Sequence, residues 1–112
     1  MRTKVLNGIP VRMSFAEEMY EEVAEALYPR VRDIRRTPSS VHAFLDEGRG
    51  ARRLSRSFSV DRDGEWELFA TDWNGAAAKE TGRIRKTEAE MQNLVSRAAE
   101  WFAADRQEVL SR

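Results

Sequence analysis

Few side chains in this sequence could do covalent or acid–base chemistry, and their spacing matches no known catalytic pattern. His42, the one histidine, stands four residues before Asp46, a spacing that on a helix would place a base beside the carboxylate that orients it. Ser39 and Ser40 precede the histidine, but the glycine pattern of a nucleophile elbow is absent. We therefore expect no catalytic residue and no enzymatic activity.

Metal and cofactor sites are not expected either. The chain has no cysteine and one histidine, which leaves no thiolate ligand and no usual zinc set. The segment 61–65 resembles part of a calcium loop, but Trp66, Leu68 and Phe69 stand where oxygen ligands would be needed. The glycine array of a phosphate loop is also absent. The sequence thus predicts no metal and no cofactor.

Composition limits the class of protein further. The 112 residues suffice for a single domain with one core, and their 41% hydrophobic and 34% charged fractions are typical of a folded chain. Nineteen basic and nineteen acidic side chains give zero net charge, which argues against a uniformly basic nucleic-acid-binding protein. No run approaches the ~20 apolar residues of a membrane span. We therefore expect no membrane partner and, outside any larger assembly, a cytoplasmic location.

The charges are unevenly distributed along the first half of the chain. Residues 14–28 contain five acidic side chains and no basic one, whereas residues 29–56 contain eight arginines. This pattern predicts an acidic and a basic face, which identical subunits would pair head to tail. The basic face would otherwise meet an acidic protein or nucleic acid. The predicted interface residues are Glu17, Glu18, Glu21, Glu22, Glu25, Arg49, Arg52 and Arg53.

The first thirteen residues are expected to form an arm. Asn7-Gly8 is a favoured pair for a two-residue hairpin turn, and Pro10 confines any strand here to a sheet edge. Segment 1–13 is therefore either an edge hairpin or a loose N-terminal extension.

A long helix is expected next. Ser14 and Glu17 have the spacing of a capping box at its start. Pro29 interrupts the apolar pattern, so the helix either ends near Leu27 or kinks and continues to about Arg36, and we favour the kinked or broken helix. Its apolar stripe consists of Phe15, Met19, Val23 and Leu27.

A short helical segment is predicted after that boundary. Thr37 is placed as its cap, with Pro38 at the first helical position. Its apolar face would be Val41, Phe44 and Leu45, and glycines at 48 and 50 would end it in a loop.

Residues 54–72 carry the clearest information about the fold. Apolar and polar side chains alternate in two runs, which predicts two strands joined by a tight turn. A three-residue loop places Val60 opposite Trp66 and Phe58 opposite Leu68, which keeps the apolar side chains on one face. Gly64 then takes the left-handed position of the turn. The outward side chains would be Ser55, Ser57, Ser59 and Glu67.

The last third is predicted to be a connection followed by a helix. Residues 72–86 are expected to be a connecting loop, in which 76–80 forms a helical turn or a short third strand. Thr87 and Glu90 have capping-box spacing and begin a long C-terminal helix. The apolar side of this helix would be Met91, Leu94, Val95, Ala98, Trp101, Phe102 and Leu110.

The expected fold class is therefore α+β, in one domain over residues 1–112. It has a long N-terminal helix kinked or broken near Pro29, a central antiparallel β-hairpin or small sheet, and a long C-terminal helix packed on one sheet face. The side chains predicted to form the centre of the core are Phe58, Leu68, Trp66, Leu94 and Trp101.

The order of these elements resembles the tail-completion proteins of long-tailed bacteriophages, which are minor tail or neck proteins of the head–tail connector. The resemblance covers roughly residues 51–102. Leu54, Ser57, Phe58 and Val60 match the family's Gly-x-Leu-x-x-Ser-hydrophobic-x-Val strand. Thr81-Gly82 lies near the family's Gly-Thr turn in the opposite order, and the usual Pro-Phe-Leu before the last helix is absent.

This resemblance implies a structural protein of the virion, assembled in the host cytoplasm. Copies would form a ring at the head–tail junction, joined to neighbouring connector and tail proteins, with non-specific contact to DNA in the channel. Segments 1–13 and 72–86 would be the arms, and Arg49, Arg52 and Arg53 would contact the DNA or an acidic neighbour.

Two other functions remain open from the residues themselves. One is a small intracellular inhibitor or immunity-type protein, whose acidic helix would cover a basic enzyme. The other is a nucleic-acid-binding regulator that uses the arginine patch.

Overall fold

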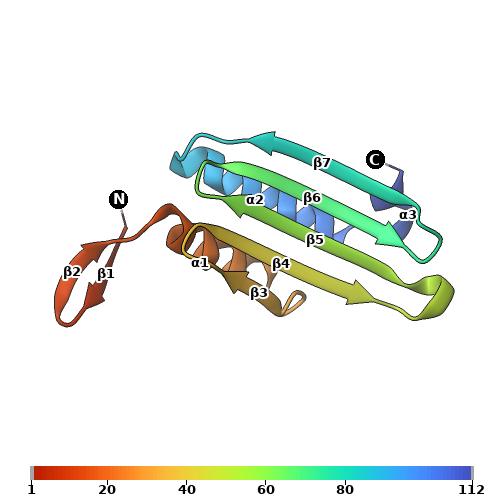
Figure 1. Cartoon of the computed structure of the whole chain (residues 1–112), viewed down its shortest axis with the longest axis horizontal. Helices are drawn as coiled ribbons and strands as arrows, with labels where there is room; N and C mark the ends of the chain where they lie inside the picture. Colours follow the sequence, from red (N-terminus) through yellow and green to blue (C-terminus); the bar gives the residue numbers. More distant parts are fainter. Residues whose placement is uncertain (1, 112) are drawn as a thin grey trace.

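A short β-ribbon opens the chain and stands apart from the rest of the molecule (Figure 1), in a computed structural model that describes residues 2–111. β1 (Thr3–Leu6) and β2 (Ile9–Arg12) form a two-stranded antiparallel sheet of their own. Asn7 and Gly8 both have positive φ in the turn between them, as a two-residue hairpin requires. The segment is thus a hairpin and not a loose extension, and it forms a sheet of its own apart from the main sheet.

Helix α1 (Phe15–Leu27) begins at the predicted capping box. The Ser14 side chain accepts from the Glu17 N–H, and the Glu17 carboxylate accepts from the Ser14 N–H. The kinked helix to Arg36 is wrong, because α1 ends at Leu27 and the residues after Pro29 form strand β3 (Asp33–Arg36). Proline lacks the N–H that a continuing helix needs, so the chain turns there into a sheet. The buried side chains of α1 are Ala16, Met19, Val23 and Leu27.

Strand β4 (Ser40–Glu47) stands where a short helix was predicted from Thr37-Pro38, and that prediction is wrong. Val41 and Ala43 are buried on the side of the helices, whereas Phe44 is exposed on the other side. β4 pairs with β3 on one edge and with β5 on the other. These pairings supply the hydrogen bonds that a helix would have supplied locally.

The main sheet has five antiparallel strands in the order β3-β4-β5-β6-β7. β5 (Leu54–Asp61) and β6 (Glu65–Asp72) meet in the predicted register, with Val60 opposite Trp66. Phe58 faces Leu68, also as predicted. A connecting loop over residues 72–86 is wrong for residues 77–83, because β7 (Ala77–Arg83) pairs with β6 along its length. The third-strand alternative is therefore the one that the chain adopts.

The β5–β6 turn depends on Gly64, whose φ is 82° as predicted for the left-handed position. A Cβ added there would lie 2.3 Å from the carbonyl oxygen of Ile84, whereas one added at Gly75, with φ of 83°, meets nothing within 4 Å. We expect Gly75→Ala to cost about 1–2 kcal/mol of unfolding free energy from backbone strain alone. Gly64→Ala should cost clearly more, because the Ile84 carbonyl must also move. Urea denaturation of both variants measures the difference, and equal losses would contradict it.

The two long helices lie on the same side of the sheet, behind it in Figure 1, and pack against each other. The core fills the space between them and the sheet. Phe58, Leu68, Leu94 and Trp101 are buried as predicted. Trp66 is only partly buried, with the Arg97 guanidinium 5.3 Å from its ring centroid. No helix within residues 2–111 is long and apolar enough to cross a membrane.

The C-terminal helix is shorter than predicted. α2 (Glu88–Ala103) begins with the Thr87 side chain accepting from the Glu90 N–H. The Glu90 carboxylate accepts from the Arg85 N–H and not from that of Thr87, so the predicted capping box is only half formed. Leu110 belongs to a separate short helix, α3 (Arg106–Leu110), which starts at an Asp105 cap.

Candidate functional site

His42 and Asp46 do not form a catalytic pair. Four residues along a strand span about 13 Å, so β4 separates the two side chains that a helix would have brought together. His42 Nε2 instead lies 2.9 Å from Ser40 Oγ, which is 2.7 Å from Thr37 Oγ1. This hydrogen-bonded series spans the turn between β3 and β4. Among residues 2–111 no group of three His, Asp or Glu side chains could hold a metal ion.

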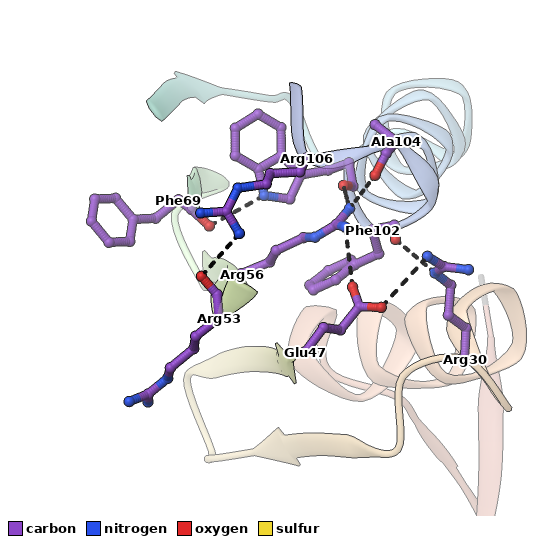
Figure 2. Close-up of polar contacts among 9 residues, drawn as sticks. Arg30, Glu47, Arg53, Arg56, Phe69, Phe102, Ala104 and Arg106 are labelled. Atoms are coloured by element: carbon purple, nitrogen blue, oxygen red, sulfur yellow. Dashed lines mark hydrogen bonds and ion pairs between the residues drawn. The ribbon is translucent and has the colours of Figure 1, made fainter. Parts of the chain in front are cut away.

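Two arginines of the predicted basic segment, Arg56 and Arg30, contact the C-terminal end of α2 (Figure 2). Arg56 is buried there, whereas the Arg30 side chain remains 51% exposed. Arg56 is 5% exposed, and its Nη1 donates to the carbonyl oxygens of Trp101 at 2.8 Å and Ala104 at 2.6 Å. Arg30 Nε donates to the carbonyl of Phe102 at 2.6 Å. The last carbonyls of a helix lack partners within the helix and carry its negative dipole end, so cations stabilise them.

Glu47 completes this cluster from the end of β4. Its Oε1 lies 3.0 Å from Arg56 Nη2, and its Oε2 lies 4.0 Å from Arg30 Nη2. Burial lowers the pKa of the Arg56 guanidinium, and the nearby Glu47 charge opposes that shift. The strand alternation in the sequence does place Arg56 on the apolar face, with Leu54 and Phe58. Arg30, Glu47 and Arg56 therefore connect the sheet to the C-terminal end of α2 and have a structural role.

Arg106 makes a second tie at the same end of the molecule. Its guanidinium donates to Asp72 Oδ2 at 3.1 Å and to the backbone carbonyls of Ala51 at 3.3 Å and Arg53 at 3.4 Å. In Figure 2 the side chain of Arg53 points away from this contact. The backbone of the β4–β5 connection is thus held, while its arginine side chains face outward.

One of these arginines, Arg53, lies near an exposed tryptophan that sequence reasoning missed. Leu54 pairs with Asp72, so Arg53 and Trp73 follow as the next opposing residues at the strand ends. Trp73 is 64% exposed. The predicted β5–β6 register already contained the signal for this neighbour. We call the four exposed side chains Arg49, Arg52, Arg53 and Trp73 the arginine–tryptophan end.

The predicted acidic face of α1 is largely engaged within the molecule. Glu17 pairs with Lys4, and Glu18 accepts from the backbone N–H of Arg2. Glu22 pairs with the Arg2 side chain and accepts from Gln92 of α2. These contacts fix the base of the arm to α1, and they leave Glu21 and Glu25 as the exposed acidic side chains of the set. The five glutamates therefore do not form one continuous free acidic surface, and their part in an interface stays a prediction.

The Glu17 contacts predict a measurable pH dependence. The Lys4 ammonium and the Ser14 N–H lower the pKa of the Glu17 carboxyl to about 2. A carboxyl with a depressed pKa in the folded state adds stability above its unfolded pKa of about 4.3, and this is lost as the pH falls toward 2. Glu17→Gln should therefore lower the melting temperature at pH 6 and have less effect at pH 2. An exposed control, Glu21→Gln, should show no such trend, and a Glu17→Gln effect that is constant with pH would contradict the expectation.

The arm carries exposed aliphatic side chains on both of its faces. Val5, Leu6 and Ile9 are 74%, 55% and 63% exposed. The base of the ribbon is held by the hydrogen bond from Met13 N to Arg2 O and by the ion pairs to α1. The tip therefore projects beyond the end of the main sheet (Figure 1) in a defined direction.

The sheet face opposite the helices carries a trough along β5. The predicted outward side chains Ser55, Ser57 and Ser59 lie on this face, alternating with the buried side chains of β5. Phe44 of β4 and Phe69 of β6 are the register partners of Ser57 on either side, and Asp46 pairs with Ser55. A hollow here is lined by Phe44, Phe69, Ser55, Ser57, Asp46 and Thr71, among others. We call it the serine trough.

No protein-family model, curated protein or solved structure gives a significant match to the chain. The arm, the serine trough and the arginine–tryptophan end are therefore the features from which a function can be inferred.

Proposed function

We propose that this protein is a non-catalytic assembly subunit, which associates with copies of itself and with neighbouring proteins. In its most specific form this is a subunit of a ring at the head–tail junction of a long-tailed bacteriophage, between connector and tail. The observation that carries the proposal is the arm, with Val5, Leu6 and Ile9 more than half exposed. A two-stranded ribbon gains little stability alone in water, and clustered exposed aliphatic side chains usually mark an interface.

The placement of the other surfaces supports association of a head-to-tail kind. The molecule is 52 Å long, with the arm at one end and the β4–β5 and β6–β7 connections at the other (Figure 1). Unlike surfaces at opposite ends suit heterologous contacts, which close into rings when the rotation between subunits allows. Arginine and tryptophan are also enriched among the residues that dominate interface energies. The arginine–tryptophan end is thus a candidate contact for an acidic neighbour or for channel DNA.

The assembly proposal is tested by mass and by location. Sedimentation velocity of the purified chain should show a concentration-dependent species larger than a monomer, and negative-stain images should show rings. Antibodies against the chain should then label the head–tail junction of phage particles from the source culture. A species that stays monomeric would contradict the assembly function, whereas particles without label would contradict only the neck location.

Nucleic-acid binding is a second candidate, because Trp73 lies beside Arg53 at the arginine–tryptophan end. An aromatic ring on which a base stacks, next to cations that contact phosphates, is the usual combination for single strands. Arg52→Ala with Arg53→Ala should then weaken oligonucleotide binding and reduce its salt dependence. Unchanged affinity in that variant would exclude this candidate.

The inhibitor hypothesis has less support, since three of the five α1 glutamates contact the arm or α2. It would depend on Glu21 and Glu25. A monomer that forms a 1:1 complex with a basic enzyme would favour it over the assembly function.

A further inference from the structure

We propose that the serine trough of one subunit binds the β1–β2 arm of a second copy of this chain. The inference rests on the proposed function, because it names the surface through which copies would associate. It goes beyond that function by assigning a receptor site for the arm and a register for the contact.

The trough has a shape that suits a ribbon. Adjacent strands lie about 4.8 Å apart, so Phe44 and Phe69 stand roughly 10 Å apart on either side of the small Ser57. Ser55 and Ser59 continue the low floor along β5. Stacked sheets pack about 10 Å apart with interdigitated side chains, so a second layer of strands can place a row of aliphatic side chains over this floor.

The outer face of the arm offers one apolar cross-strand pair, Val5 and Pro10, for this floor. Register places Val5 opposite Pro10 and Thr3 opposite Arg12, so these four side chains share one face of the ribbon. Leu6 and Val11 lie on the other face, which lines a groove toward α1. Ile9 pairs with Leu6 and therefore shares that inner face. The outer face, where Val5 is 74% exposed, is the one available to another molecule.

A pair of opposite charges, one on the arm and one on the trough, sets how the arm is aligned along the trough. Arg12 is exposed two residues after Pro10, and Asp46 is exposed two residues after Phe44. Neither Arg12 nor Asp46 has an ion pair within residues 2–111. When Val5 and Pro10 lie over the Phe44–Ser57–Phe69 row, the next step along each strand brings Arg12 to Asp46. Arg12 is the basic side chain of the arm that is left for this rim, because Arg2 and Lys4 pair with α1. The Arg35 guanidinium, which lies over the Phe44 ring at the edge of the trough, pairs with Asp33.

The trough occupied must belong to another copy. Arg2 and Lys4 tie the base of the arm to Glu22 and Glu17 of α1, which lies on the opposite side of the sheet from the trough. The arm cannot fold back onto its own trough while these ties hold. A ribbon of this size buries less than the ~800 Å² per partner of a standard interface. A single contact is therefore weak, and closure of a ring strengthens it through linked binding.

Crosslinking tests the contact directly, because the chain has no cysteine of its own. Subunits carrying Val5→Cys are mixed with subunits carrying Ser57→Cys and treated with a short bis-maleimide. A crosslinked pair should form, and it should be absent when Val5→Cys is mixed with the control Ser96→Cys, an exposed position on α2. Equal crosslinking to both positions, or none to Ser57→Cys, would overturn the proposal.

Charge exchange tests the register by sedimentation of the full chain. Arg12→Glu and Asp46→Arg should each weaken self-association about three- to tenfold, and the double variant should regain most of it. Val5→Asp should weaken association at least tenfold, while Ser96→Asp should leave it unchanged. If the wild-type chain assembles but Val5→Asp assembles equally well, the assembly function stands and the arm–trough contact is wrong. If the wild-type chain remains a monomer at every concentration, both are wrong.

Discussion

Replacing Arg56 with alanine is expected to lower the free energy of unfolding by about 3–5 kcal/mol. The variant removes the two charge-assisted hydrogen bonds that Arg56 donates to the Trp101 and Ala104 carbonyls, at 2.8 and 2.6 Å. It also leaves Glu47 without the guanidinium that lies 3.0 Å away. The whole free energy of unfolding of a small domain is about 5–15 kcal/mol. A loss of this size should therefore lower the urea concentration at the unfolding midpoint substantially.

Two further variants separate the causes of that loss. Arg56→Lys keeps the charge but not the planar fork that reaches two carbonyls and Glu47 together, so it should recover only part of the stability. Arg53→Ala removes an exposed arginine of the same strand region and should change the unfolding free energy by less than about 0.5 kcal/mol. A loss for Arg56→Ala as small as that for Arg53→Ala would show that the α2 end does not need this cap.

Trp101→Ala is expected to destabilise the protein by about 3–5 kcal/mol. Trp101 is fully buried in the core, and its indole N–H donates to the Phe69 carbonyl at 3.2 Å across the helix–sheet interface. Truncation therefore opens a large cavity and leaves a strand carbonyl without this donor. Thermal unfolding followed by circular dichroism would record the change.

Trp101→Phe and Trp73→Ala are the matched controls for this prediction. The phenylalanine variant keeps most of the packing and loses the hydrogen bond, so it should cost about 1–2 kcal/mol. Trp73 is 64% exposed, and its removal should have little effect on stability. An unchanged melting temperature for Trp101→Ala would place the indole outside the core and contradict the packing described above.

The elements that could be predicted from sequence are those whose local signals agree with one another. The capping box at Ser14 and the four-residue apolar repeat both indicate α1, and both are confirmed. Alternation over residues 54–72, together with the turn at Gly64, was sufficient for the correct register. That register held because a shift of one residue would turn Phe58 and Leu68 away from the core.

Prediction failed where a short apolar run fits two periods. Val41, Phe44 and Leu45 lie on one helical face, but Val41, Ala43 and Leu45 also alternate as in a strand. Phe44 favoured the helical interpretation because it extended the apolar helical face, although in the structure it lies on the open face of the sheet. The strand was selected by pairing with β5, in which the partners of Val41, Phe44 and Leu45 lie 11 to 19 residues further along the chain and leave no local signal. The same pairing separates His42 from Asp46.

The candidate surfaces also differ in whether local sequence patterns could indicate them. Local patterns were sufficient to indicate an arm, through Asn7-Gly8 with the hairpin form left open, and to place the outward serines of β5, through alternation. Which charges are available depends on the tertiary structure, because ion pairs and helix caps join residues far apart along the chain. It placed Arg56 and Arg30 at the end of α2 and set Glu17 and Glu22 against the arm. It also brought Phe44 and Phe69 to the two sides of Ser57, because a trough between strands exists only once their register is formed.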